Sequence, residues 1–372
     1  MRLHIINNEK ITIRTIQLFE KVFPQGNTFI VLETSRERFD ISVFHSKIVF
    51  VNGNDAASFW RAVGDINQYK HVVIHCLGYR VTQLLKNISH PSIYWIEWGA
   101  DLYINLLQPK GYKLFDNPDY MLRQKSILPL FITKLLYKAR RKQYQIASRN
   151  FAKKVKYFVP DSMPGEYELL LSYYPELSHL QFKDFFYYPI DMILPDKNLT
   201  SKGRNIMINH CSSFTGNHFE VMDLLSTLDL AGRNIVIPVS YGDKKNAINI
   251  EKEATKLFGD RALIIKDYLP LEEYNKVLED CDVFIFGHYR QEAVGNILIA
   301  LYLGGKVFLH NYNPLLGFYK SIGLTLYSIE DDLDSSSLKQ KMTLQEINKN
   351  KQILEEYYSE ERLLRLIKEN FD

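Results

Sequence analysis

Two polar segments in the second half of the sequence have residue types suited to holding a diphosphate. The first, TGNH at 215–218, lies between an expected strand and the helical pattern FEVMDLLSTL. Small and hydrogen-bonding residues at a helix N-terminus offer backbone N–H groups and about half a positive charge to an anion. Thr215, Asn217 and His218 are therefore candidate contacts. The alternative interpretation is that Thr215 or Asn217 only caps the helix.

The second segment, GHYRQEAVGN at 287–296, has the same design after another expected strand. The Arg290 guanidinium can donate two parallel hydrogen bonds to phosphate oxygens. Gly295 allows a close backbone approach just ahead of an apolar helix. Glu292 would repel a phosphate, so we expect a sugar or ribose hydroxyl as its partner, with a solvated surface acid as the alternative. Two anion-binding loops at one sheet edge predict a diphosphate site.

Two further segments follow strands and could contact the same ligand. Tyr241 and Gly242 begin the turn YGDKK, which could help to hold a phosphate or a base. Tyr268 lies in DYLPLEEY and could receive a pyrimidine. The alternative interpretations are an ordinary polar turn for the first segment and a helix start marked by Pro270 for the second.

Asp101 is the candidate general base. It follows the expected strand SIYWIE and Gly99, where the chain turns into a helical pattern. A sugar hydroxyl is a poor nucleophile, and a carboxylate within hydrogen-bond reach can take its proton as a new bond forms. Burial beside Trp98 would raise the pKa of Asp101 and make it a better base. Capping of the helix is the alternative role, and Glu97 and His75 are the reserve candidates for the catalytic group.

No metal and no other cofactor is expected. Cys76, Cys211 and Cys281 are far apart in the sequence and form no CxxC motif, which also indicates a reducing compartment. The pair Asp280 and Asp282 resembles a metal-binding DxD motif. Asp282, however, begins an expected strand at the end away from the polar loops, so we reject a metal site there.

The elements that must position these residues form two series of strands separated by helical patterns, which predicts α/β domains with parallel sheets. The first series is expected at 2–6, 28–32, 48–51, 71–76, 92–97, 155–159 and 184–188. The second is expected at 205–209, 234–239, 262–265, 282–286, 306–309 and 324–327. We place domain boundaries at 1–197, 198–335 and 336–372, the last a helical tail that packs back across the domains. Ligands of such sheets bind at the carboxyl ends of the strands.

Charge and composition restrict the partners. The chain has 372 residues and a net charge of +3, which is too little to indicate nucleic acid. Residues 122–156 nevertheless contain eleven Lys/Arg and no Asp or Glu, interleaved with apolar residues. This pattern favours an anionic membrane surface, with RNA or a solvated helix as alternatives. Because no apolar run approaches the ~18 residues of a spanning helix, we expect a cytoplasmic protein, peripheral on the inner face of the membrane.

The order of several short motifs resembles that of a known family. These motifs are His75, WGADLY (98–103), TGNH, SYG (240–242), EEY (272–274) and RQEAVGN (290–296). Their order is similar to that in the TDP-N-acetylfucosamine:lipid II N-acetylfucosaminyltransferase family. The resemblance is spread over most of the chain and is weakest in 105–200 and after 335.

The resemblance implies a GT-B fold, two Rossmann-like domains facing across a cleft, and inverting, metal-independent glycosyl transfer. The implied donor is a dTDP-activated 4-acetamido-4,6-dideoxyhexose, and the implied acceptor is a saccharide on undecaprenyl diphosphate. Asp101 matches the acidic position of WGADLY. The donor-side positions of the family are matched by Asn217, His218, Arg290, Gln291, Gly295 and Asn296. The sequence departs from the family pattern at Asn209-His210-Cys211, where Gly-Asn-Ser is usual, and at Glu292, where Gln is common.

Three alternatives remain open. The same architecture would suit a fucosyltransferase that uses a GDP-sugar, or a nucleotide-sugar epimerase. A non-catalytic carbohydrate or membrane adaptor could also retain the fold, although Asp101 argues against it.

Overall fold

The computed structural model describes residues 1–372 except 10, 34–37, 118–121, 123–127 and 162. The described chain divides into two compact units. Unit 1 comprises 1–112, 137–187 and 360–372, and unit 2 comprises 113–136 and 188–359.

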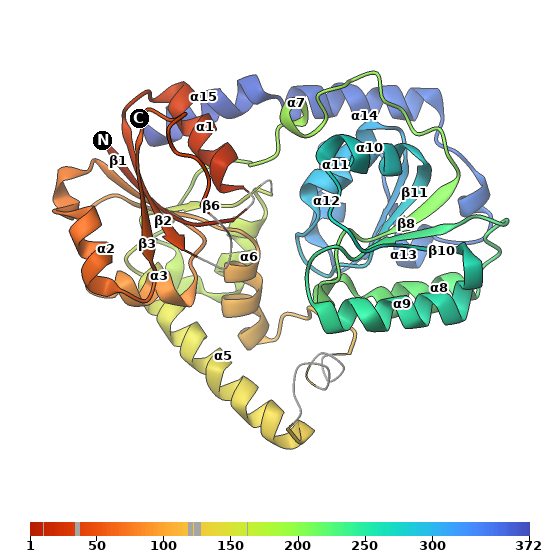
Figure 1. Ribbon diagram of the computed structural model, residues 1–372, viewed down its shortest axis with the longest axis horizontal. Helices are drawn as coiled ribbons and strands as arrows, with labels where there is room; N and C mark the ends of the chain where they lie inside the picture. Colours follow the sequence, from red (N-terminus) through yellow and green to blue (C-terminus); the bar gives the residue numbers. More distant parts are fainter. Residues whose placement is uncertain (10, 34–37, 118–121, 123–127, 162) are drawn as a thin grey trace. The chain divides into compact units, whose positions relative to one another are not determined.

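Unit 1 is built on a seven-stranded parallel sheet with the order β3-β2-β1-β4-β5-β6-β7. The strands are β1 (Arg2–Asn7), β2 (Asn27–Glu33), β3 (Lys47–Asn52), β4 (His71–His75), β5 (Ile93–Ile96), β6 (Tyr157–Val159) and β7 (Gln181–Phe182). The helices are α1 (Thr12–Val22), α2 (Ala56–Val63), α3 (Tyr79–Leu84), α6 (Glu166–Tyr173), α15 (Glu360–Phe371) and the π-helix η2 (Ala100–Leu107). Helices α1 and α15 lie together over one face, and α2 and α3 lie over the other (Figure 1).

Unit 2 has a six-stranded parallel sheet with the order β10-β9-β8-β11-β12-β13. The strands are β8 (Asn205–Ile208), β9 (Ile235–Pro238), β10 (Ala262–Ile265), β11 (Cys281–Phe286), β12 (Lys306–Leu309) and β13 (Tyr327–Ser328). The helices are α7 (Ile190–Ile193), α8 (His218–Ser226), α9 (Lys244–Phe258), α10 (Leu271–Glu279), α11 (Val294–Tyr302), α12 (Pro314–Ser321), α13 (Ile329–Asp332) and α14 (Leu344–Tyr357). Helices α8 and α9 pack together on one side of the sheet, and α11 and α14 on the other (Figure 1).

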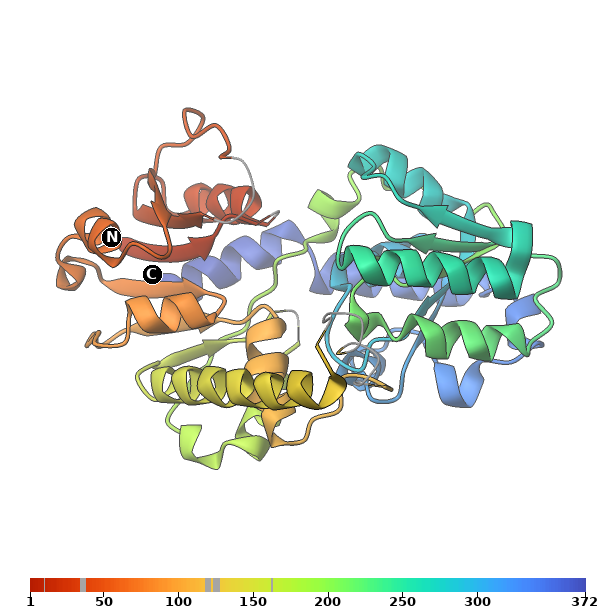
Figure 2. The same cartoon turned by 60° about the horizontal axis from the view of Figure 1, so that its bottom comes forward.

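Helix α5 (Leu130–Ala152) is one uninterrupted helix whose first turns are assigned to unit 2 and the remainder to unit 1 (Figure 2). No described helix is both long enough and apolar enough to cross a membrane.

The central strands are buried along their whole length and mostly apolar because helices cover both faces of each sheet. Every residue of β4, β5, β9, β11 and β12 is buried. In both sheets the strand order reverses between two central strands: β1 and β4 in unit 1, and β8 and β11 in unit 2. Each sheet therefore has a point at which neighbouring crossovers diverge and ligands of open parallel sheets bind.

Several sequence expectations differ from the structure. The run 184–188 is not a strand; it forms one bridge, between Phe185 and Asp161. The side chains of Phe185, Phe186 and Tyr187 are buried, so the apolar pattern reflects the core of unit 1 rather than sheet pairing. At 324–327 only Tyr327 belongs to a strand.

The domain boundaries also lie elsewhere than the predicted 1–197, 198–335 and 336–372. The division falls at 187/188, because α7 packs on α11 and the Ile190 N–H donates to Tyr358 O at 2.8 Å. The tail 336–372 is not a separate part: α14 packs on α11 in unit 2, and α15 packs on α1 in unit 1.

Candidate active site

The two polar loops of unit 2 follow β8 and β11, the strands that flank the reversal of strand order. Ile208 pairs with Ile285, so the loops 209–217 and 287–293 leave the sheet at the same level. The expectation that both loops lie at one sheet edge is confirmed by this register. By contrast, Asp282 is the second residue of β11, at the opposite end of the strand, and pairs with Arg233, with 2.6 Å between Oδ1 and Nη1. The DxD pair is therefore remote from the loops.

Asparagine side chains join the two loops. Asn209 accepts the Gly287 N–H at 3.0 Å through Oδ1 and donates to Gly216 O at 2.9 Å through Nδ2. Asn217 donates to Gly287 O at 2.9 Å and accepts the Asp116 N–H at 3.1 Å. A Cβ at Gly287 would lie only 2.6 Å from Gly216 O, so only glycine allows this close approach. Asn217, a predicted ligand contact, thus has its side chain engaged in holding the loops together.

Glu292 is the centre of a charged cluster between the loops. Its Oε2 accepts the Thr215 hydroxyl at 2.6 Å and lies 2.8 Å from Arg290 Nη2. Thr215 Oγ1 is in turn 2.7 Å from Ser213 Oγ. Burial alone would raise the pKa of Glu292, but the Arg290 charge, the nearby imidazoles of His288 and His210, and the Thr215 hydrogen bond outweigh it and lower that pKa to about 2. Glu292 is therefore ionised at physiological pH and is not a solvated surface acid.

The pairing with Glu292 changes the expected role of Arg290. The sequence predicts a guanidinium open to phosphate, whereas Arg290 contacts its own chain through Glu292 and through Nη1–H to Gln291 O at 2.9 Å. Arg290 Nε has no hydrogen-bond partner among the described residues. The Glu292 carboxylate therefore occupies Arg290, and an incoming anion would have to compete with Glu292 for this cation.

Three histidines surround this cluster: His210, His218 and His288. Burial lowers the pKa of both His218 and His288 to about 3, so these imidazoles are neutral at physiological pH. They can donate an N–H to a phosphate oxygen but carry no positive charge at that pH. His210 and His288 are not among the predicted site residues, although each lies two residues after the end of a strand.

The remaining donor-side candidates follow strands β9, β11 and β10. Gly242 bridges to Ser212, and the Tyr241 ring centroid is 5.6 Å from that of His210, so this turn adjoins the first loop. Asn296 accepts the Tyr274 hydroxyl at 2.8 Å, and Gly295 lies in the first turn of α11 against Tyr188. Tyr268 lies after the edge strand β10, two strands from β8, with its side chain 68% exposed. Tyr268 is thus the candidate that the topology places farthest from the cluster.

Asp101 lies at the carboxyl end of β5 in unit 1, as the sequence predicts, and it is 1% exposed. Its Oδ2 accepts the Leu77 N–H at 2.6 Å and the Trp95 indole N–H at 2.7 Å, and its Oδ1 accepts the Trp98 N–H at 2.8 Å. Burial raises the pKa of Asp101, and these donors oppose the rise. The carboxylate therefore holds the turns after β4 and β5 together, and the role of a base stays a prediction.

Glu97 and His75, the reserve candidates, are also buried at the ends of their strands. Burial and the Asp101 charge raise the pKa of Glu97 to about 8. The Glu97 carboxyl accepts the N–H groups of Gly99 and Asp161. His75 lies 2.6 Å from the Tyr187 hydroxyl and 3.0 Å from His4, and burial lowers its pKa to about 3. The contacts of His75 are those of a core histidine.

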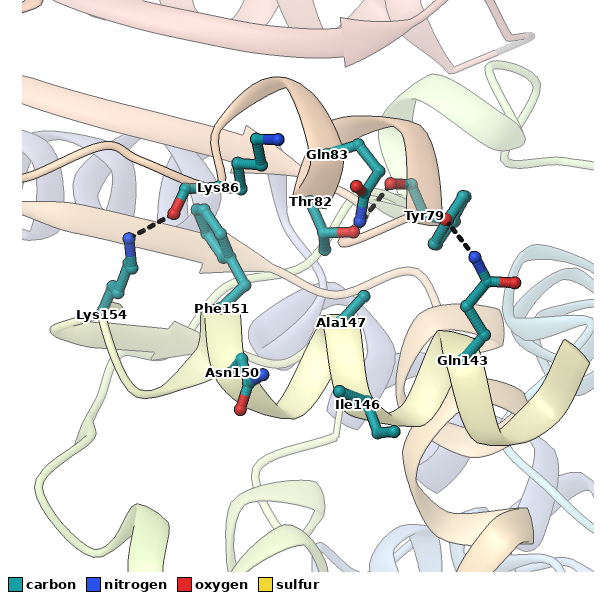
Figure 3. Close-up of a pocket in the computed structure, with 10 residues that line it drawn as sticks. All are labelled: Tyr79, Thr82, Gln83, Lys86, Gln143, Ile146, Ala147, Asn150, Phe151 and Lys154. Atoms are coloured by element: carbon teal, nitrogen blue, oxygen red, sulfur yellow. Dashed lines mark hydrogen bonds between the residues drawn. The ribbon is translucent and has the colours of Figure 1, made fainter. Parts of the chain in front are cut away.

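A groove lies between α3 and α5 in unit 1, with a volume of about 390 Å³ (Figure 3). Its polar lining includes Lys86, Lys154 and Gln143, and no acidic residue. The Lys154 ammonium donates to Lys86 O at 2.6 Å, while Gln143 donates to the Tyr79 hydroxyl at 2.5 Å. Arg123 and Lys125 of the predicted basic stretch 122–156 lie outside the described residues.

Solved structures of other proteins share this fold. A sucrose-phosphate synthase from Thermosynechococcus elongatus superposes with a TM-score of 0.64 at 10% identity, covering 99% of this chain and 98% of that one. A glycosyltransferase from Rickettsia africae gives 0.59 at 13% identity, covering 98% and 95%. Anabaena HepE in complex with UDP gives 0.59 at 9% identity, covering 99% of both chains. The two parallel-sheet units and these neighbours define the GT-B fold of glycosyltransferases.

The family is given by a match to the second half of the sequence. Residues 169–362, more than half of the chain, match the model of 4-alpha-L-fucosyltransferase, glycosyl transferase group 56. The chain belongs to this family and is a glycosyltransferase. The matched segment contains both polar loops and the Glu292 cluster.

Proposed function

We propose that the protein is an inverting, metal-independent glycosyltransferase that moves a deoxyhexose from a nucleotide diphosphate to a lipid-linked saccharide. One observation carries the proposal: two polar loops meet beyond β8 and β11, at the reversal of strand order. This is where open parallel sheets bind their ligands. The HepE complex with UDP supports a nucleotide as one part of the ligand.

In this proposal the diphosphate binds at the loops and competes with Glu292 for Arg290. The free Nε of Arg290 and the N–H groups of neutral imidazoles such as that of His288 would contact phosphate oxygens. The charge of the leaving diphosphate would thus be stabilised by one cation and several dipoles. Glu292, displaced from Arg290, would accept hydrogen bonds from sugar or ribose hydroxyls.

Asp101 acts as the base in the same proposal. The acceptor oxygen bonds to the anomeric carbon while the nucleotide diphosphate leaves with the bonding electron pair, which inverts that carbon. The hydroxyl proton passes to the Asp101 carboxylate. Oδ1 is the better-placed oxygen, because it accepts one N–H from a neighbouring residue whereas Oδ2 accepts two.

Two donors are compatible with the family. A dTDP-linked 4-acetamido-4,6-dideoxyhexose is our first candidate, with a saccharide on undecaprenyl diphosphate as acceptor, because the motif order resembles that of the enzymes that use them. A GDP-linked fucose is the second, because the description of the matching family model names a fucosyltransferase. Mass spectrometry of the product with each donor, with and without acceptor, distinguishes the two and also detects epimerisation.

A thermal-shift panel of dTDP, UDP, GDP and CMP tests the donor site. A nucleotide at about 100 times its Kd stabilises the native state by about 2.7 kcal/mol, and we expect dTDP to give the largest shift. Arg290→Ala should reduce this shift. Arg204→Ala is the matched control, since Arg204 precedes β8 at the other end of the sheet. The absence of a shift with all four nucleotides would contradict the proposal.

We further propose that α5 attaches the protein to an anionic membrane surface. Its exposed apolar side chains include Phe131 at 78% and Leu135 at 61% exposure. Its basic residues are Lys134, Lys138, Arg140, Arg141, Lys142 and Arg149, and α5 contains no acidic residue. The α3–α5 groove, lined by Lys86, adds a place for a phosphate headgroup (Figure 3).

Vesicle sedimentation tests the attachment. The protein should bind vesicles of phosphatidylglycerol and phosphatidylcholine more tightly than vesicles of phosphatidylcholine alone, by about 1 kcal/mol for each cation near the surface. A variant with Lys138, Arg140 and Lys142 changed to Gln should lose this difference. A matched triple change at Lys244, Lys252 and Lys276 in unit 2 should not. Equal binding to both vesicle types would contradict the proposal.

A further inference from the structure

A second kind of ligand site lies within the Glu292 cluster. His210 and Cys211 follow β8, and Glu292 follows β11. One ring nitrogen of His210, the Cys211 sulfur and one carboxylate oxygen of Glu292 all lie within 4.8 Å of one another. His210 and Cys211 are 8% and 3% exposed, so the three groups are enclosed by protein. These are also three of the positions at which the sequence departs from the pattern of the family that it resembles.

His288 adds a fourth group that points to a ligand. Its side chain is fully buried, and neither ring nitrogen has a hydrogen-bond partner among the described residues. Its Nε2 lies 3.8 Å from Glu292 Oε1, and its ring centroid is 5.3 Å from that of His210. Thr215 and Arg290 both contact Oε2, which leaves Oε1 on the side of His288. A buried imidazole with no partner is costly, and a ligand between these groups would satisfy it.

The donor set selects the class of ligand. Imidazole nitrogen, thiolate sulfur and carboxylate oxygen together suit a borderline divalent ion such as Zn²⁺, whereas Mg²⁺ and Ca²⁺ prefer oxygen ligands alone. Zinc bonds of 2.0–2.3 Å in a tetrahedron place the ligand atoms about 3.3–3.8 Å apart. The side chains therefore need to approach by about 1 Å, while the asparagine hydrogen bonds keep the two loops in register.

We infer that His210, Cys211, Glu292 and His288 form a binding site for Zn²⁺ or a similar borderline divalent ion, and that this ion excludes the sugar donor. The Cys211 thiol releases its proton to solvent, and its sulfur binds the ion. The ion also bonds to Glu292 Oε1 and to the two imidazoles. It has no part in glycosyl transfer. The inference of a metal site depends only on the arrangement of these four side chains. The inference that the ion competes with the donor rests on the proposed function of the loops.

Cobalt substitution tests the metal site without any sugar donor. Co²⁺ added to the reduced, chelator-treated, tag-free protein should give thiolate-to-metal charge-transfer absorption in the near ultraviolet. Zn²⁺ should displace the Co²⁺ and remove this absorption. Cys211→Ser should abolish this absorption, and Glu292→Gln should weaken Co²⁺ binding by at least about tenfold. Cys76→Ser is the matched control, because Cys76 lies in unit 1, and it should retain the absorption. Circular dichroism of each variant establishes that it folds.

The outcomes distinguish failure of the metal site from failure of its competition with the nucleotide. If the wild-type protein shows no charge-transfer band, or if Cys211→Ser keeps it, the metal site does not exist. If the band is present, calorimetry with dTDP, or with whichever nucleotide binds best, tests the exclusion: Zn²⁺ should weaken nucleotide binding in wild type and not in Cys211→Ser. Unchanged nucleotide affinity in zinc-loaded wild type would overturn the competition while leaving the metal site intact.

Discussion

Glu97 in unit 1 and Glu292 in unit 2 follow central strands of similar sheets, yet their surroundings have opposite effects. Glu97 is buried near another carboxylate, Asp101, and its pKa rises to about 8. Glu292 is also enclosed, but it contacts Arg290 and the Thr215 hydroxyl, and its pKa falls to about 2. At neutral pH the Glu97 carboxyl of unit 1 therefore keeps its proton, whereas the Glu292 carboxyl of unit 2 is ionised. The neighbouring cation, rather than burial, decides between the two.

The contrast has a chemical meaning in the proposed reaction. A carboxylate such as that of Asp101, whose pKa is raised, is a stronger base and is suited to receive a proton, as the acceptor side requires. A carboxylate that stays ionised beside an arginine keeps that cation in place until a stronger anion, such as a diphosphate, replaces it. The following predictions test this difference.

Asp101→Asn should have the largest effect. A general base contributes about 10²–10⁴-fold to the rate, so transfer should fall by that factor while nucleotide affinity, which depends on unit 2, stays the same. Single-turnover transfer and calorimetry with the same nucleotide measure the two quantities.

A structural role of Asp101 needs its own control, because the carboxylate accepts three N–H groups. Trp95→Phe removes one of these donors and keeps the carboxylate, so it should lower the melting temperature and retain most of the transfer. Transfer at the wild-type rate by Asp101→Asn would remove Asp101 from the role of base.

Glu97→Gln should change the pH dependence of stability. Between pH 4.5 and about 8 the folded protein keeps the Glu97 proton that the unfolded chain has released, so this carboxyl makes the free energy of unfolding fall as pH rises. The slope is up to about 1.4 kcal/mol per pH unit. Glutamine has the shape of the protonated Glu97 side chain but does not titrate, so it removes this contribution to the pH dependence of the free energy of unfolding. Urea denaturation from pH 5 to 8 should therefore show the variant gaining stability relative to wild type, and parallel curves would show that Glu97 is ionised in the folded state.

Glu292→Gln should have a smaller effect of the opposite sign. The lowered pKa of Glu292 stabilises the fold at neutral pH, and this contribution is lost as pH falls from about 4.5 to 2. The variant should be less stable by about 3 kcal/mol at pH 7 and should approach wild type only below about pH 2. Because Arg290 is released, dTDP should bind more tightly. Weaker dTDP binding would contradict the competition between Glu292 and the diphosphate for Arg290.

Hydrophobic patterning was enough to predict the parallel sheets, and strand ends were enough to indicate where polar residues gather. Both loops of unit 2 and the placement of Asp101 after β5 follow from that reasoning. The pairing of Arg290 with Glu292 does not, because two residues in one loop give no indication of which side chain turns toward the other. The prediction of a strand at 184–188 was wrong because buried aromatic residues give the same pattern whether or not they pair in a sheet.

Helix α15 gives unit 1 a particular order of assembly. Phe371 is buried against Phe19, and the Tyr94 hydroxyl donates to Asn370 O at 2.7 Å. The ribosome makes all of 188–359 before it makes these residues. Unit 2 can therefore fold during synthesis, while the sheet face of unit 1 that α1 and α15 share lacks α15 until residues 360–371 are made. Chaperone dependence and cotranslational aggregation should consequently concentrate in the part of the protein that is synthesised first.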